Sequence, residues 1–134
     1  MDYIQLETAI DRFGEMLEAF RHNEKRPPLE QEAVQDSLIK RFEYTLEVAW
    51  KTCKRHLVEE GFAEAATGSP KSIMRLAAQR NWVANPETWF GYLQFRQDTS
   101  HDYSSDKAEA VLDICEDFYL DVTKLYQGMS SESA

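Results

Sequence analysis

The chain has 134 residues, which suits one domain, and 43% of them are hydrophobic, so it can bury a substantial core. Only 5 Gly and 4 Pro are present, which argues against a turn-rich all-β fold. The formal charge of -9 makes the molecule as a whole a poor match for nucleic-acid phosphates, although residues 40–56 hold five Lys/Arg against two Glu and form a basic patch.

Neither a leader nor a membrane segment is evident in the sequence. Charged residues begin at Asp2, and no run approaches the roughly 20 apolar residues that a membrane-spanning helix needs. We therefore expect a soluble, cytoplasmic protein. Cys53 and Cys115 each fall on an apolar helical stripe, so we expect buried thiols rather than a disulfide.

Two long amphipathic helices are predicted in the first half of the chain. Residues 2–23 repeat apolar side chains in steps of three and four until Pro27-Pro28, and residues 30–60 carry the longest such stripe, ending before Gly61. Tyr44 and Trp50 lie off that stripe. This second apolar face indicates contact with another helix or with another subunit.

Two proline-initiated helices follow a loop that ends at Gly68. Ser69-Pro70 supplies an N-cap and a first-turn proline for a short helix over residues 70–80, and Asn85-Pro86-Glu87 repeats the signal. The second of these helices places three side chains on one face, namely Trp89, Leu93 and Arg96, with Phe90 on a neighbouring face.

Ser104-Ser105-Asp106 can cap a last helix, whose apolar stripe runs to Tyr126. We expect Gly128 to end this helix and residues 129–134 to form a disordered tail. The sequence thus predicts a single domain over residues 1–128. Its predicted fold is all-α, an antiparallel up-down bundle of four main helices plus a short one.

The histidines and cysteines do not show the spacing of metal ligands. His22, His56 and His101 are far apart and form no H-x-x-x-H or E-x-x-H pair, so we expect no metal site. No glycine-rich phosphate loop is present, and we expect no cofactor. Gly68-Ser69-Pro70-Lys71 is open to two interpretations, an anion-binding helix start or, as we favour, an ordinary capped helix.

The main candidate site is the polar segment over residues 96–103. Arg96 continues an apolar stripe, so its stem can pack while its guanidinium binds an anion. On a continuous helix the Cα atoms of Arg96 and His101 would be about 140° apart around the axis. Either the helix breaks before His101, or two copies of the segment meet across a two-fold axis.

These groups suit acid–base cleavage of RNA. Histidine can take a proton from a 2′-hydroxyl or give one to the leaving oxygen, and arginine can stabilise the phosphorane-like transition state. The alternative is that these residues have structural roles only. In that case Arg96 pairs with Asp98 or Asp102, His101 caps a helix end, and Tyr103 packs beside that cap.

The residues of this polar segment resemble a motif of a known family. The spacing of Arg96, His101 and Tyr103 is similar to the R-x4-H-x-Y signature of HEPN domains. Two further blocks, residues 41–51 and 68–73, resemble the nucleotidyltransferase substrate-binding protein branch, and the resemblance covers roughly residues 5–126. The position after the arginine, usually Asn, Asp or His in the family, is Gln97 here.

The resemblance implies a HEPN-like helical bundle that forms a homodimer and pairs with a minimal nucleotidyltransferase as a toxin–antitoxin system. It implies a metal-independent endoribonuclease in which Arg96 and His101 are catalytic. It also implies that the partner silences the nuclease, in some members by attaching AMP to the tyrosine of the motif, here Tyr103. The family's older name reflects another role, a non-catalytic subunit that binds nucleotide or substrate for the nucleotidyltransferase.

Overall fold

In the part of the chain that the structure describes, five α-helices form an antiparallel bundle, so the predicted all-α fold is confirmed. The computed structural model describes residues 1–101 and 108–132, with residues 100, 101, 108 and 109 described by their backbone alone, and these parts contain no strand. Two 3₁₀ helices, η1 and η2, lie in the connections. The elements are α1 (Ile4–Arg21), η1 (Asn23–Lys25), α2 (Pro28–Glu59), η2 (Ala63–Thr67), α3 (Pro70–Gln79), α4 (Pro86–His101) and α5 (Ala108–Glu132).

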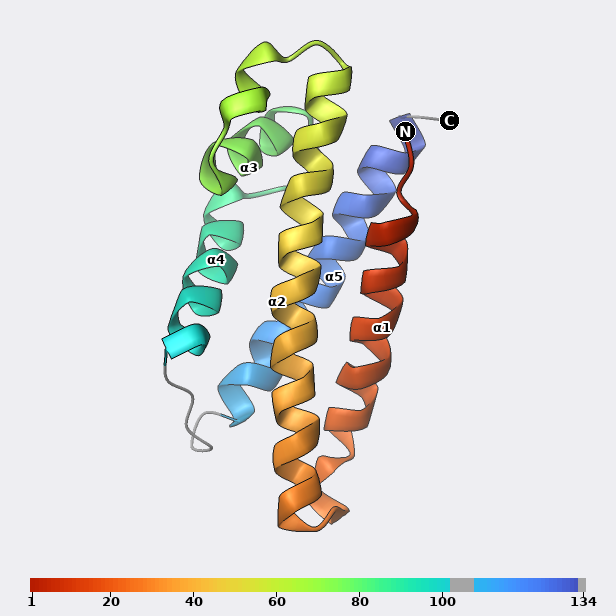
Figure 1. The fold of residues 1–134 in the computed structure, drawn as a ribbon, viewed down its shortest axis with the longest axis vertical. Coiled ribbons are helices and arrows are strands. Elements are labelled where there is room, and N and C mark those ends of the chain that lie inside the picture. Colours follow the sequence, from red (N-terminus) through yellow and green to blue (C-terminus); the bar gives the residue numbers. More distant parts are fainter. Residues whose placement is uncertain (102–107, 133–134) are drawn as a thin grey trace.

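Helix α2 is the spine of the molecule. It has 32 residues, which corresponds to about 48 Å at the usual rise per residue. It contacts α1, α3, α4 and α5, and Figure 1 shows it between α4 on one side and α1 on the other, with α5 behind. Side chains on two edges of α2 can therefore meet two different helices.

Local signals set both ends of α2. Pro28 occupies the first turn, where its missing N–H costs nothing. At the other end Gly61 has φ +94°, and the N–H groups of Gly61 and Phe62 donate to the carbonyls of Val58 and Leu57. This pattern is a Schellman motif, and it confirms Gly61 as the residue that ends the helix.

The core is centred on one phenylalanine of α5. The Phe118 ring makes edge contacts with Phe13 of α1, Phe42 of α2 and Trp89 of α4, with ring centroids 5.6, 4.9 and 5.6 Å away. All four side chains are essentially inaccessible to solvent. Because each such ring buries about 150–250 Å², this cluster fixes how three helices pack on α5.

The end of α5 differs from the prediction. The helix does not stop at Gly128 but continues to Glu132, and Met129 is fully buried, so residues 129–132 are not a disordered tail. Gly128 instead lies where α5 packs closely against Trp82. A Cβ there would lie 3.2 and 3.3 Å from atoms of Trp82, so glycine permits close approach of α5 to the α3–α4 connection.

Both cysteines are buried as expected and neither forms a disulfide. Burial raises the pKa of Cys53, and it raises the pKa of Cys115 to about 12. Both therefore behave as small apolar core residues. None of the helices in the described ranges combines the length and apolar character required to cross a membrane.

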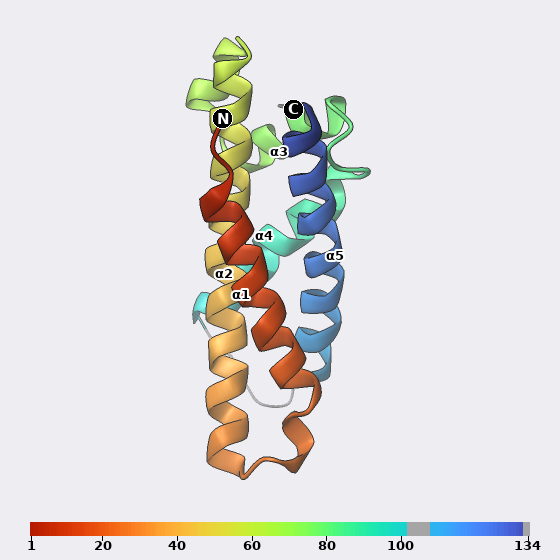
Figure 2. The ribbon, with the colours of Figure 1, turned by 90° about the vertical axis from the view of Figure 1, so that its right-hand side faces the viewer.

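A charged network joins the two chain ends to the bundle. His56 of α2 is 3% exposed; its Nδ1 lies 2.6 Å from the Tyr3 hydroxyl and its Nε2 lies 2.6 Å from Glu60. The Arg80 guanidinium binds the carboxylates of both Glu60 and Glu132. Tyr3 also donates to the Met129 carbonyl at 3.1 Å. The start of α1 and the last turns of α5 lie at the same end of the molecule (Figure 2).

We predict that Arg80→Met lowers the free energy of unfolding by about 1 kcal/mol near neutral pH. The hydrogen bond from Arg80 is the main cause that holds the pKa of Glu60 below its usual value. Stability from a depressed carboxyl pKa is present above its unfolded value, about 4.3, and is lost as the pH falls toward the folded value. The difference between wild type and variant should therefore shrink below about pH 4.

Urea unfolding of both proteins across this pH range measures the effect. Arg75→Met, which alters an exposed arginine of the adjoining helix α3, is the control. An Arg80→Met deficit that is the same at neutral and acidic pH would contradict this account of the network.

Candidate functional site

Arg96 lies on the side of α4 that faces α2. Helix α4 begins at Pro86, and the Asn85 side chain accepts the Glu87 N–H at 3.0 Å, as its start signal predicts. Trp89 is buried and Leu93 is half-buried, while the Arg96 side chain is 37% exposed. The prediction that Trp89, Leu93 and Arg96 share one face of α4 is thus confirmed. The side chains on this face become more exposed to solvent from Trp89 to Arg96.

The Arg96 guanidinium binds a carboxylate that the sequence interpretation did not identify. Nη1 of Arg96 donates to Oε2 of Glu47, on α2. Within the described ranges Arg96 makes no ion pair with Asp98, whose carboxylate accepts a hydrogen bond from Gln94 at 3.1 Å. Asp102, the other partner considered, lies outside the described residues.

Two neighbours on α2 hold the Glu47 carboxylate. Lys51 Nζ lies 2.8 Å from Oε1, and Trp50 Nε1 donates to Oε2 at 3.2 Å. Burial raises the pKa of Glu47, but the hydrogen bonds from Lys51, Trp50 and Arg96 outweigh it and hold this pKa below its usual value. Glu47 is therefore an anion at neutral pH. Together with the cations Lys51 and Arg96 it forms a group with a net charge of +1. The i, i+4 spacing of Glu47 and Lys51 was the one sequence signal for this arrangement.

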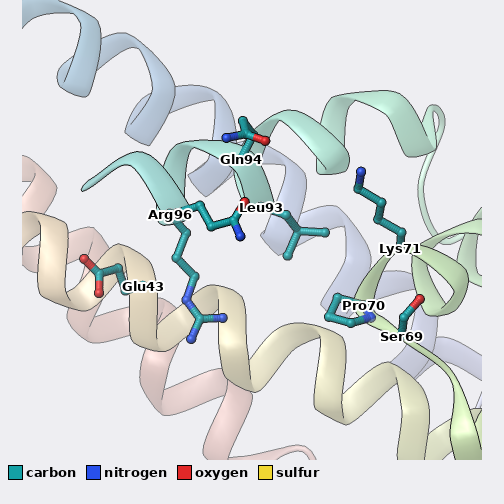
Figure 3. A pocket seen from close by; sticks show the side chains of 8 residues that line it. Glu43, Ser69, Pro70, Lys71, Leu93, Gln94 and Arg96 are labelled. Atoms are coloured by element: carbon teal, nitrogen blue, oxygen red, sulfur yellow. The ribbon is translucent and has the colours of Figure 1, made fainter. Parts of the chain in front are cut away.

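A pocket of about 540 Å³ lies beside Arg96, between α2, the start of α3 and α4 (Figure 3). Its wall combines an apolar centre at Leu93 and Pro70 with polar groups around it. Cationic side chains reach it from α3 and α4, which suits a ligand that carries negative charge. The lining residues are Glu43, Ser69, Pro70, Lys71, Leu93, Gln94, Arg96 and Gln97.

The start of α3 is an ordinary capped helix, the interpretation that we favoured. Ser69 Oγ accepts the Ser72 N–H at 3.2 Å, and the Ile73 N–H donates to the Ser69 carbonyl at 2.9 Å. Pro70 has no N–H to offer. Few first-turn amides are left for an anion, so Lys71, whose Nζ lies 5.6 Å from the centre of the Phe90 ring, is the main positive group at this end of the pocket.

His101 and Tyr103 were the other two residues predicted for the site. His101 is the last residue of α4, and its side chain is not among the parts that the structure describes; Tyr103 lies outside the described residues. The backbone of α4 nevertheless shows whether the helix breaks before His101. Because α4 runs unbroken through His101, the alternative in which the helix breaks before His101 is wrong, and the Cα atoms of Arg96 and His101 stay about 140° apart around one axis.

The basic patch lies on the outer side of α2, next to this site. Lys51 pairs with Glu47, and Lys54 Nζ lies 6.0 Å from the centre of the Trp50 ring. Arg55 is exposed on the same side. Tyr44 is 54% exposed, so within the described part of the chain the second apolar face of α2 is open to solvent at this tyrosine.

The described ranges contain one cluster of possible metal ligands, which sequence spacing did not reveal. Ligand atoms of His56, Glu60 and Glu132 lie within 4.8 Å of one another. The Arg80 guanidinium binds both carboxylates and so provides the positive charge there. We interpret this cluster as the ion-pair network that joins the chain ends.

Known proteins resemble the chain over most of its length. The family described as "nucleotidyltransferase substrate binding protein like" matches residues 1–131. A Haemophilus influenzae protein named probable ribonuclease HepT is 28% identical over 104 residues, which are 76% of this chain and 71% of that protein.

Two solved structures share the fold. One, from Haemophilus influenzae and described as the substrate binding domain of a nucleotidyltransferase, has a TM-score of 0.86 and 23% identity, covering 96% of this chain and 99% of that one. The other, from Thermus thermophilus, has a TM-score of 0.74 and 25% identity, covering 92% and 98%. The chain belongs to the nucleotidyltransferase substrate-binding protein family of HEPN domains, as its motif over residues 96–103 predicts.

Proposed function

We propose that this protein is a metal-independent endoribonuclease that works as a homodimer and is silenced by a minimal nucleotidyltransferase. The observation that carries the proposal is the guanidinium of Arg96, which a partly buried carboxylate holds at the edge of a cationic pocket. The similarity to a protein named as a probable ribonuclease supports it.

The proposed reaction needs only groups of the motif. His101 takes the proton of a ribose 2′-hydroxyl or gives a proton to the leaving 5′-oxygen, while the 2′-oxygen bonds to phosphorus and the bond from phosphorus to the 5′-oxygen breaks. Arg96 stabilises the charge on the phosphorane-like transition state. The products are a 2′,3′-cyclic phosphate and a 5′-hydroxyl.

A dimer brings these two residues together. Since α4 does not break before His101, one helix carries Arg96 and His101 on different sides. A two-fold axis close to this helix would place His101 of one protomer beside Arg96 of the partner subunit. The exposed Tyr44 on the outer side of α2 is apolar surface that such an interface would cover.

The nuclease proposal predicts that expression of the chain without its partner slows growth and cleaves cellular RNA. His101→Ala or Arg96→Ala should relieve the growth defect and lower cleavage about a hundredfold or more, because each removes a group that acts in the transition state. Arg75→Ala is the matched control, since Arg75 is an exposed arginine outside the site. Intact RNA with wild type and with His101→Ala alike would contradict the proposal.

A second candidate is a non-catalytic subunit that presents a nucleotide or an acceptor to the nucleotidyltransferase. The pocket of about 540 Å³ beside Arg96 favours it, because its wall combines cations, amides and an apolar centre. This alternative predicts complex formation without RNA cleavage.

We predict that Tyr103 receives AMP from the nucleotidyltransferase partner. After incubation of the two proteins with α-labelled ATP, label should be covalently attached to wild type and to Tyr44→Phe, which changes an exposed tyrosine of α2. It should be absent from Tyr103→Phe, because this variant lacks the phenol that would attack the α-phosphate and release pyrophosphate. Equal labelling of Tyr103→Phe would exclude Tyr103 as the acceptor.

A further inference from the structure

The residue that fixes Arg96 belongs to a different helix, and its own position is fixed by its neighbours. Glu47 side-chain atoms are 28% exposed, so the carboxylate is partly shielded from water. Oε1 meets Lys51, while Oε2 accepts from both Trp50 and Arg96. A carboxylate with donors on both oxygens cannot turn freely.

The contact uses one end of the guanidinium fork. Among the described residues Glu47 engages Nη1 of Arg96, which leaves Nε and Nη2 on the other edge of the fork to meet a ligand. Lys51, Lys71 and Arg96 carry three positive charges against the two negative charges of Glu43 and Glu47, so the site keeps a net charge of +1 and still attracts a phosphate. Glu47 therefore orients the arginine without cancelling the local charge.

We propose that Glu47 is a positioning residue for Arg96, an inference that rests on the proposed nuclease function. Glu47 holds the flexible arginine side chain in the orientation that receives a phosphate oxygen at the edge of the pocket. An arginine that is already in place loses less conformational freedom when the transition state forms. The loss of Glu47 should then reduce turnover more than it reduces binding.

The test compares Glu47→Gln with wild type in cleavage of a short RNA. Glutamine has nearly the same shape but no charge, so the fold should persist, and thermal unfolding checks that it does. We expect kcat to fall about 10- to 100-fold while KM changes less than about threefold, since a small misplacement of a catalytic group can cost about a hundredfold. Glu59→Gln, at an exposed site near the end of α2, should match wild type.

A double-variant comparison separates positioning from a general structural effect. If Glu47 acts through Arg96, adding Glu47→Gln to Arg96→Ala should cause no further loss of activity. Fully additive losses, or a Glu47→Gln variant that cleaves RNA like wild type, would overturn the inference.

A nitrogen-15 NMR comparison needs no activity. Glu47→Gln should shift the Nε–H signal of Arg96 and the indole N–H signal of Trp50, because both side chains donate to this carboxylate. Unchanged signals would overturn the inference even in an active enzyme. If the wild-type protein shows no RNA cleavage that is lost in His101→Ala, the proposed nuclease function is overturned. The NMR comparison would then still decide whether Glu47 fixes Arg96.

Discussion

The contact between Phe95 of α4 and Phe42 of α2 governs the geometry of the site. Their rings meet edge to face with centroids 5.4 Å apart, and Phe42 is itself fixed by Phe118 at the centre of the core. Phe95 immediately precedes Arg96, so this contact sets both the separation of the two helices and the rotation of α4. The ion pair between Arg96 and Glu47 follows from it, because the core packing brings the two side chains within reach.

Much of the fold could be predicted from the sequence, because its signals are local. Ser69-Pro70 and Gly61 each specify a helix end through bonds within a few residues, and the structure shows both. The prediction that Gly128 ends α5 was wrong, because a glycine that ends a helix cannot be distinguished in sequence from one that allows a neighbouring residue to pack closely. Only the approach of Trp82, 46 positions earlier in the chain, distinguishes the two uses.

The candidate site was less accessible to sequence reasoning. Spacing placed Arg96 on the face of α4 that carries Trp89, because helical periodicity alone decides it. The partner of Arg96 could not be found this way. Asp98 is near in sequence but lies two positions away, where helical side chains diverge, whereas Glu47 is 49 positions away and meets Arg96 only through helix packing.

The central claim is that Arg96 and His101 act together across a two-fold axis, and heterodimers test it most directly. Two differently tagged chains, one with Arg96→Ala and one with His101→Ala, would be co-expressed and the mixed dimer purified through both tags. If His101 of one protomer works with Arg96 of the partner subunit, each mixed dimer retains one complete site and about half of wild-type cleavage. A mixed dimer as inactive as the two variant homodimers, or a wild-type protein that sediments as an active monomer, would contradict the account.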